Sequence, residues 1–298
     1  MTAPTDGPAR PEPGVRVLCA PNPSAMTFRG TNTYVLGEGR VTVIDPGPDD
    51  PRHLAAILSA LDPGEKVARI VVTHAHLDHS ALARPLSDAT GAPILAFGGA
   101  EDGRSPAMQR MADAGLSGGG EGLDRAFSPD LRIAEGDVLD GDGFTLRVLH
   151  TPGHLPGHVA LDWGGRLFCG DHVMGWATSI VSPPDGDMGA YMASLDRLAR
   201  QSWRRLYPGH GDPIDDAAGR LATLIAHRQA RESAILAALA RGLQTPAAIA
   251  RAVYADTPAA LMRAAERNVL AHLIDLTARG IVQARDDADG TGGYGLSR

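Results

Sequence analysis

Three histidines and one aspartate stand within six residues of the stretch "RIVVTHAHLDHSA". The β-branched run before them predicts a strand that ends at this point. His74 and His76 are two residues apart, so in an extended chain their side chains point to the same side. A helical turn after them would bring Asp78 and His79 back toward the same space. Four nitrogen and oxygen ligands from one loop predict a site for a divalent metal ion such as zinc.

Three further segments each place one metal-binding side chain after a strand-like run. They are "HTPGH" with His154, "FCGDH" with Asp171 and "YPGHG" with His210. A glycine beside each of these residues would let the backbone approach an ion closely. Because four ligands from one loop cannot complete two metal sites, we expect these three residues to supply the remainder.

The motifs "THAHLDH", "TPGH", "GD" and "PGHG", in this order, resemble the metallo-β-lactamase superfamily over residues 15 to about 215. The resemblance implies an αββα sandwich with a dinuclear metal site between two β-sheets. It also implies that His74, His76 and His154 hold one ion, that Asp78, His79 and His210 hold the second, and that Asp171 bridges both. The segments "GTNTYVLG" and "HRQARE" and the C-terminal tail look like the lactamase-β-2-like branch, in which an animal mitochondrial member is an endoribonuclease.

Such a site would activate water. Two metal ions about 3.5–4 Å apart can share a water molecule and lower its pKa toward about 7. The resulting metal-bridging hydroxide would attack a carbonyl carbon or a phosphorus atom, and Asp78 would orient it as the catalytic carboxylate. A metal route needs no serine nucleophile. Two zinc ions are the expected cofactors, although manganese or iron would suit the same ligands.

Four further residues have both a functional and a structural interpretation. His158 either touches the substrate or orients the loop that carries His154, and Asp45 either bonds a ligand histidine or caps a turn. Tyr191 either donates a hydrogen bond to the substrate or packs beside a loop. Arg228 either meets an anionic substrate or forms a surface ion pair with Glu232.

Short strands and helices must position these residues. Strand-like runs punctuated by glycine and proline precede or contain the motifs, in the residue ranges 15–20, 31–37, 41–47, 68–74, 93–98, 144–154, 158–165, 166–171 and 204–211. Helices are expected from Asp50 and Pro51 onward and from about Asp187. Residues 99–130 are rich in glycine and predict a long loop. The fold class is α+β.

The last part of the chain has a different character. Residues 220–242, 245–254 and 261–280 read as three helices, and two short strands around a Gly-rich turn follow them. We therefore expect a disordered lead at 1–14, a metallo-β-lactamase-fold catalytic domain at 15–215 and a winged-helix-like domain at 216–298. The tail carries ten arginines against eight acidic residues, and the whole chain has a net charge of −7.

The composition narrows the function. The acidic charge argues against a protein that coats nucleic acid with its whole surface. No stretch approaches the roughly 20 apolar residues of a membrane span, and the lead lacks the apolar region of a secretion signal, so a cytoplasmic protein is expected. The first hypothesis is a hydrolase of a small ester-type bond, such as a thioester or lactone. The alternatives are an endoribonuclease of single-stranded RNA and, last, a DNA-binding winged-helix regulator. A homodimer through the C-terminal domain is one arrangement that the tail allows.

Overall fold

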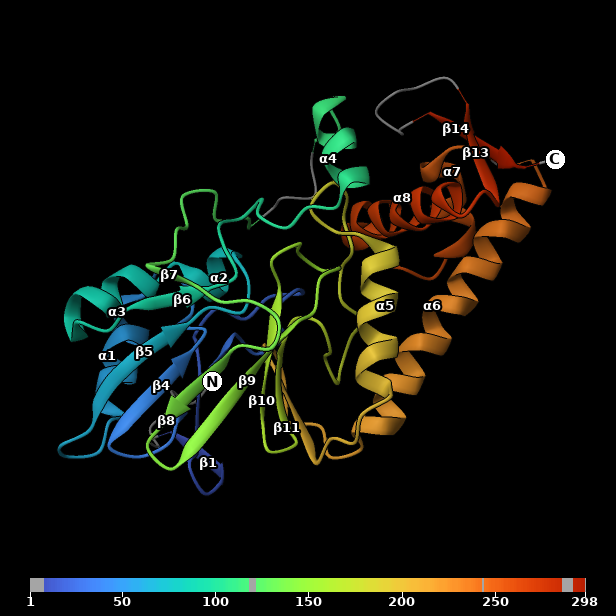
Figure 1. The fold of residues 1–298 in the computed structure, drawn as a ribbon. Helices are drawn as coiled ribbons and strands as arrows, with labels where there is room; N and C mark the ends of the chain where they lie inside the picture. Colours follow the sequence, from blue (N-terminus) through green and yellow to red (C-terminus); the bar gives the residue numbers. More distant parts are fainter. Residues whose placement is uncertain (1–7, 118–121, 243, 286–291, 298) are drawn as a thin grey trace.

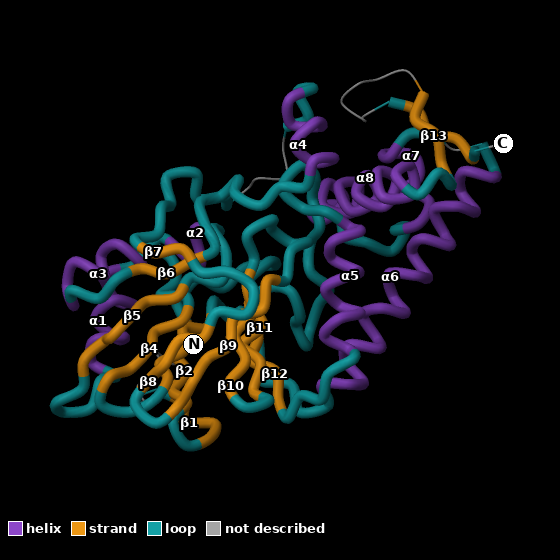
Figure 2. Tube along the Cα trace, in the orientation of Figure 1, coloured by secondary structure: helices purple, strands orange, loops and turns teal. Residues whose placement is uncertain are grey.

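Two β-sheets lie face to face between outer helices in the computed structural model, which describes residues 8–117, 122–242, 244–285 and 292–297 (Figures 1 and 2). The seven-stranded sheet follows the order of the chain from β1 to β7. Its strands are β1 Ala9–Glu12, β2 Val15–Cys19, β3 Asn32–Leu36, β4 Arg40–Ile44, β5 Lys66–Val71, β6 Ile94–Ala96 and β7 Leu131–Arg132. Strands β1 to β4 are antiparallel, and β4 to β7 are parallel.

The second sheet has five strands in the order β12-β11-β10-β9-β8. They are β8 Val138–Gly141, β9 Phe144–His150, β10 Val159–Trp163, β11 Arg166–Gly170 and β12 Arg205–Pro208. In β9 the residues from Phe144 to Val148 alternate between buried and exposed, as the period-2 pattern of a half-buried strand requires. The apolar core between the two sheets includes Leu36, Ile44, Val71, Val148, Leu161 and Phe168.

Helices cover the outer face of each sheet. The helices of this part of the chain are α1 Pro51–Ser59, α2 Leu77–Ser80, α3 Ala83–Thr90, α4 Pro106–Asp113 and α5 Met188–Ala199. Ile57 of α1 and Leu86 of α3 pack against the first sheet, and Leu195 of α5 packs against the second. The predicted αββα sandwich is therefore confirmed.

Two helix starts follow the local sequence. The side chain of Asp50 accepts a hydrogen bond from the Arg52 backbone N–H, with Pro51 in the first turn, and that of Asp187 accepts one from the Ala190 N–H. Both helix starts were expected from the sequence. Helix α4 lies within the segment where a long loop was expected, so that expectation is wrong for residues 106–113.

The C-terminal part forms a smaller unit of helices and one hairpin. It contains α6 Ala217–Ala240, α7 Pro246–Val253, the short 3₁₀ helix η1 Ala259–Leu261, α8 Met262–Ala278, β13 Val282–Arg285 and β14 Gly293–Leu296. Its own apolar core includes Ile235, Ile249, Val269 and Tyr294. The expected winged-helix-like arrangement is confirmed, and the boundary near residue 215 stays a prediction just ahead of α6.

The N-terminal lead is partly ordered. Residues 9–12 form β1 against β2, and Glu12 accepts hydrogen bonds from the side chains of Arg166 and Tyr207. The prediction of disorder at 1–14 is wrong for this strand, because ladder bonds and a half-buried carboxylate hold it, while residues 1–7 lie outside the described residues. None of the described helices combines the length and apolar composition that a bilayer crossing requires.

Candidate metal centre

The seven predicted ligands gather at one edge of the sandwich. His74, His76, Asp78 and His79 follow β5, with the last two on the short helix α2. His154 lies in the loop between β9 and β10, Asp171 directly after β11, and His210 just beyond β12. Strands β11 and β12 are parallel, so their carboxyl ends deliver Asp171 and His210 to the same edge.

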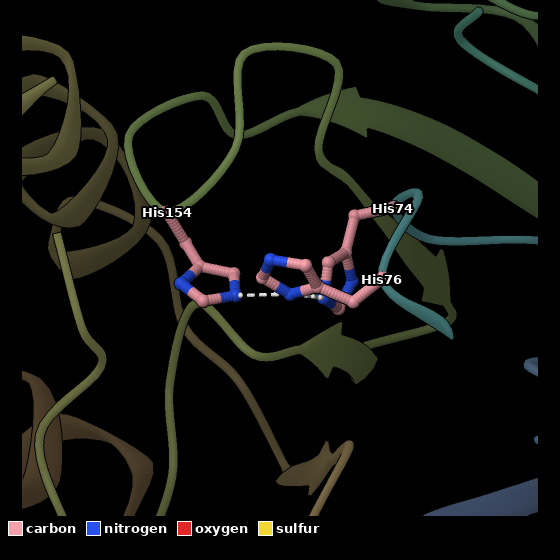
Figure 3. Close-up of side chains that lie close together, drawn as sticks. All are labelled: His74, His76 and His154. Atoms are coloured by element: carbon pink, nitrogen blue, oxygen red, sulfur yellow. Dashed lines mark hydrogen bonds between the residues drawn. The ribbon is translucent and has the colours of Figure 1, made fainter. Parts of the chain in front are cut away.

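Three histidines form the first cluster (Figure 3). The Nδ1 atom of His76 lies 3.0 Å from Nε2 of His74 and 3.1 Å from Nε2 of His154. The three ring nitrogens converge on one point from two different loops, although 78 residues separate His76 from His154 in the sequence. A divalent ion at this point would meet three nitrogen ligands.

The second cluster contains both aspartates. Nε2 of His210 lies 3.3 Å from Oδ2 of Asp78 and 3.3 Å from Oδ2 of Asp171. Nε2 of His79 lies 3.5 Å from Oδ2 of Asp78 and 3.4 Å from Oδ1 of Asp171. Asp171 also approaches the first cluster, since its Oδ2 lies 3.8 Å from Nε2 of His154. Its carboxylate therefore lies between the two groups of candidate ligands.

Hydrogen bonds donated by Nδ1 orient four of the five candidate ligand histidines. His79 donates to Oδ2 of Asp45 at 2.9 Å, His154 to the carbonyl of Ile180 at 2.7 Å, and His210 to the carbonyl of Gly30 at 3.2 Å. His74 donates to Thr73 Oγ1 at 2.9 Å, because that hydroxyl gives its own proton to Asp45. In each ring the bond leaves Nε2 directed into the site.

The donor set fits metal ions. Nε2 of His79 and Oδ1 of Asp171 are buried and have no hydrogen-bond partner among the described residues. Buried polar atoms without a partner are costly, and a metal ion between them would satisfy both. The candidate ligand atoms within each group lie within 4.8 Å of one another. Imidazole and carboxylate ligands suit zinc, manganese and iron alike.

The two clusters differ in protonation. Burial lowers the pKa of His76 to about 3, with His154 adding to the effect, and burial likewise lowers the pKa of His74 and His154. Burial opposes the charged form of His210 as well, but Asp171 and Asp78 outweigh it and raise the pKa of His210 to about 9. The first cluster is thus neutral and ready to bind an ion, whereas an ion entering the second must displace protons.

The two aspartates stay ionised in this setting. Burial by itself would raise the pKa of Asp171, yet His210 and His79 hold it well below its ordinary value. The pKa of Asp78 is lowered as well, because His79 and His210 outweigh its burial. Both carboxylates are therefore available as anionic ligands near neutral pH.

Three predicted substrate residues are buried instead. His158 accepts a hydrogen bond from the backbone N–H of Asp171 at 3.2 Å, and its other ring nitrogen bonds to Thr151 Oγ1. The Tyr191 hydroxyl donates to the carbonyl of His172 at 3.1 Å. Arg228 is 1% exposed. The prediction that these side chains meet the substrate is corrected, because none of them reaches the surface of the site.

Other residues near the site were not identified from the sequence. Thr31 donates a hydrogen bond from Oγ1 to Oδ2 of Asp78 at 3.1 Å. Phe28 and Trp176 stack at the surface with ring centroids 5.0 Å apart. Asp45, for which the sequence left two roles open, bonds His79 and both the N–H and hydroxyl of Thr73. The exposure and stacking of Phe28 and Trp176 depend on tertiary contacts, which no local pattern predicts. Only the segment "GTNTY", which contains Thr31, was noted in the sequence.

Comparison with known proteins agrees with this geometry. Residues 26–210 match the metallo-beta-lactamase superfamily, and residues 245–291 match the beta-lactamase associated winged helix domain. The beta-lactamase-like protein 2 homolog of Drosophila melanogaster is 32% identical over 92% of this chain and 91% of that protein. The lactamase-like protein adaB of Aspergillus niger is 31% identical over 74% of this chain and 62% of that protein.

Solved structures show the same fold over almost the whole chain. A beta-lactamase domain protein from Burkholderia ambifaria has a TM-score of 0.80 at 26% identity and covers 99% of this chain and 95% of its own. A metallo-beta-lactamase family protein from Thermus thermophilus has a TM-score of 0.74 at 26% identity, covering 96% and 99%. The chain therefore belongs to the metallo-beta-lactamase superfamily of hydrolases and carries the associated winged helix domain at its C-terminal end.

Proposed function

We propose that this protein is a dinuclear metal hydrolase that cleaves a small ester-type bond, such as a thioester or lactone. The observation that carries the proposal is a set of exposed apolar side chains around the metal centre. Phe28, Leu77 and Trp176 are between 37% and 47% exposed. Leu77 stands between the ligands His76 and Asp78 in the sequence, and Trp176 contacts Gly211 beside His210. An apolar rim favours an acyl or ring substituent over a polyanion.

The ligand roles follow the two clusters. His74, His76 and His154 would hold one ion, Asp78, His79 and His210 the other, and Asp171 would contact both. When bound, a zinc pair lowers the pKa of water and polarises the bond to be cleaved. Manganese or iron would suit the same ligands, and a solved relative with a TM-score of 0.52 at 30% identity is described in a di-iron-bound form.

Asp78 is the proposed catalytic carboxylate. Its side chain is 26% exposed, compared with 10% for Asp171, so it is the more accessible of the two. Thr31 holds one of its oxygens by a hydrogen bond, and its lowered pKa keeps it ionised. An ionised, oriented and accessible carboxylate can accept a hydrogen bond from the attacking water and direct it toward the substrate.

An endoribonuclease of single-stranded RNA is the second candidate. The stacked Phe28 and Trp176, with the Arg29 guanidinium 5.1 Å from the Phe28 ring centre, would offer a surface on which a base could stack. Arg29, however, is paired with Asp212, and the chain has a net charge of −7. The charge balance therefore favours the small ester.

A DNA-binding regulator has the least support. Its recognition element would be α8, but α8 buries Val269, Leu270 and Leu273 in the C-terminal core and contacts α5 of the catalytic part. Arg267 of α8 donates a hydrogen bond to Ser182. A helix covered on this face has few side chains left for a DNA groove. A cytoplasmic location and a homodimer through the C-terminal domain remain predictions from the sequence.

The proposed function is tested by assaying several substrates with one preparation of the protein. Zinc-loaded protein is assayed on thioesters and lactones with acyl groups of increasing length and on a labelled single-stranded RNA, with Asp171→Ala as the inactive control. We expect ester cleavage that Asp171→Ala abolishes, and a KM that rises in Trp176→Ala most for the longest acyl group. Ile281→Ala, an equally exposed residue of the tail, should change nothing. RNA cleavage by the wild type without ester cleavage would establish the second candidate instead.

A further inference from the structure

Residues 179–182, called the strap below, connect the metal centre to the C-terminal domain. On the side of the metal centre, the carbonyl of Ile180 accepts the hydrogen bond from Nδ1 of His154 at 2.7 Å. Ser179 donates from its hydroxyl to the backbone carbonyls of Asp171 and His172. The strap therefore touches the side chain of one proposed ligand and the backbone of another.

Side chains of the C-terminal domain hold the other side of the strap. Arg228 of α6 donates to the carbonyl of Ser179. Asn268 of α8 accepts from the backbone N–H of Val181 at 3.2 Å, and Arg267 donates to Ser182 Oγ at 2.9 Å. Arg228 also donates to Oδ1 of Asn268 at 3.2 Å, which links the two helices at this contact. The strap residues on either side of Ile180 are thus fixed from outside the catalytic domain.

Arg228 is energetically unfavourable at this position. It is almost fully buried, and no carboxylate lies within ion-pair distance of it among the described residues. Its charge is compensated by two hydrogen-bond acceptors and by the Tyr191 ring, whose centre lies 5.1 Å from the guanidinium carbon. Its Nε atom is buried without a partner among the residues that the structure describes. Such a group costs stability, so its place is explained better by what it positions than by what it stabilises.

We propose that Arg228 and Asn268 are positioning residues, which act through the strap to hold the Ile180 carbonyl against His154. The inference rests on the proposed function, in which His154 is a metal ligand. A carbonyl bonded to Nδ1 fixes both the tautomer and the direction of a ligand histidine, and loss of such a partner weakens metal binding about 10–100-fold. The C-terminal domain thereby contributes to the metal centre without touching an ion.

The contribution is unequal between the two clusters. In the second cluster, Nδ1 of His79 is held by Asp45 and Nδ1 of His210 by the carbonyl of Gly30, both within the catalytic domain. In the three-histidine cluster, by contrast, the direction of His154 depends on the strap. Removing Arg228 should therefore weaken one ion of the pair far more than the other.

Helix α6 supplies a matched control. Arg231 lies one helical turn beyond Arg228, donates to the carbonyl of Val253 at 2.8 Å, and has its guanidinium carbon 4.5 Å from the centre of the Tyr254 ring. It makes the same kinds of contact as Arg228, but both of these partners belong to the C-terminal domain. Arg231→Met therefore reproduces the loss of a charge, a carbonyl bond and a ring contact without touching the strap.

The experiment measures zinc binding to metal-stripped protein by competition with a chromophoric chelator. For the wild type we expect two ions per chain. Arg228→Met should keep one of them at wild-type affinity and bind the other about 10–100-fold more weakly. Arg231→Met should bind both as the wild type does. Asn268→Leu on α8 removes no charge and should show the same selective loss as Arg228→Met. It replaces Arg228→Met in the experiment if the arginine variant does not fold.

Two results would overturn the inference alone. One is wild-type affinity for both ions in the strap variants, and the other is an equal loss at both ions that Arg231→Met shares, which would mark a general effect on stability. A wild type that holds fewer than two ions would overturn the proposed function, and the inference with it. The two failures are therefore distinguished by the wild-type titration.

Discussion

Each candidate ligand histidine whose Nδ1 is hydrogen-bonded to the protein presents only Nε2 to the site. Asp45 is central to this arrangement, because its carboxylate accepts hydrogen bonds from His79 and from the N–H and hydroxyl of Thr73, and Thr73 in turn orients His74. The backbone of Asp45 has a φ of 50°, a left-handed conformation that asparagine adopts more readily than most residues. The position therefore allows a test that changes one atom without straining the chain.

Asp45→Asn should weaken metal binding about 10–100-fold, because the amide cannot accept all three hydrogen bonds that the carboxylate accepts and leaves His79 free to turn. The effect should be larger at the ion of the second cluster, because Asp45 bonds His79 directly and reaches His74 of the first cluster only through Thr73. Zinc titration of the metal-stripped variant measures it. Asp142→Asn, an exposed carboxylate in the turn after β8, is the control and should leave both affinities unchanged. Wild-type affinity in Asp45→Asn would show that Asp45 does not orient His79.

His272 offers a second test, in the C-terminal core. It is buried, and neither ring nitrogen has a hydrogen-bond partner among the described residues. Burial, and then Arg228, lowers its pKa to about 3, whereas the unfolded value is near 6.5. Between these values the unfolded chain binds more protons than the folded one, so this residue makes the protein less stable as the pH falls below 6.5.

His272→Leu should raise the free energy of unfolding by about 1 kcal/mol at pH 7, because it removes a buried polar group without partners. The advantage should grow by up to about 1.4 kcal/mol per pH unit below 6.5. Urea unfolding at pH 7 and pH 5 measures both effects. His150→Leu should instead destabilise, since a ring nitrogen of His150 lies 2.8 Å from the carbonyl oxygen of Pro156. An unchanged pH dependence in His272→Leu would contradict the account.

The seven candidate ligands could be predicted from the sequence, and the structure brings them together, whereas the residues that orient them could not be predicted. The spacing within "THAHLDH" and the glycine beside each later candidate ligand are local patterns that can be recognised without knowing the fold. The burial of Tyr191, His158 and Arg228 depends on how α5 and α6 pack on the second sheet, which no local pattern specifies. The sequence therefore left both a substrate role and a structural role open for these three residues, and their burial supports the structural one.

At the scale of secondary-structure elements, the local sequence predicted where helices begin better than it predicted which elements a segment contains. Asp50 and Pro51 marked α1, and Asp187 marked α5, because a side-chain cap and a proline act on the first turn alone. Helix α4 was missed, although Ser105 and Pro106 give the same kind of signal, because the glycines around it suggested a loop. Strand β1 was missed because its partners, β2 and the side chains of Arg166 and Tyr207, lie elsewhere in the chain.

A buried ion pair connects β2 to the segment after α1. Arg16 of β2 is 2% exposed and bonds Glu65 at 2.6 Å, along with the carbonyls of Ala60 and Gly37. Arg16→Met should lower the free energy of unfolding by about 3–5 kcal/mol, because it leaves the buried carboxylate of Glu65 without its partner. Chemical denaturation measures the change.

The double variant Arg16→Met with Glu65→Leu controls for the loss of size and shape. It should recover much of the stability, since both charges are then removed together. A single variant as stable as the wild type, or a double variant less stable than the single one, would show that the pair does not hold β2 to the segment after α1.

At the scale of the whole molecule, the large apolar cores are formed by the strands, the outer helices and the C-terminal domain. Only a small cluster that includes Ala75 and Leu155 adjoins the candidate ligands His74, His76 and His154. Removing metal should therefore leave the protein folded but less stable. Ions that bind only the folded state raise the free energy of unfolding by an amount that depends on their concentration and affinity. We expect a chelator to lower the Tm while the far-ultraviolet circular dichroism stays native.

Restoring zinc should restore the Tm, and the gain should shrink at low pH, where protons compete for the ligand side chains. Differential scanning calorimetry near neutral pH and about two pH units lower would show both effects. A Tm that neither chelator nor zinc changes would mean that the clusters bind no ion. Complete unfolding in chelator would mean that the cores cannot hold the fold without metal.

The central claim is that seven side chains hold two ions, with Asp171 in contact with both. Metal content per chain, measured on zinc-loaded wild type and Asp171→Ala after removal of loosely bound metal, tests it most directly. The account predicts two ions in the wild type and no more than one in Asp171→Ala. Two ions in both proteins would contradict the bridging role of Asp171, and none in the wild type would contradict the metal centre itself.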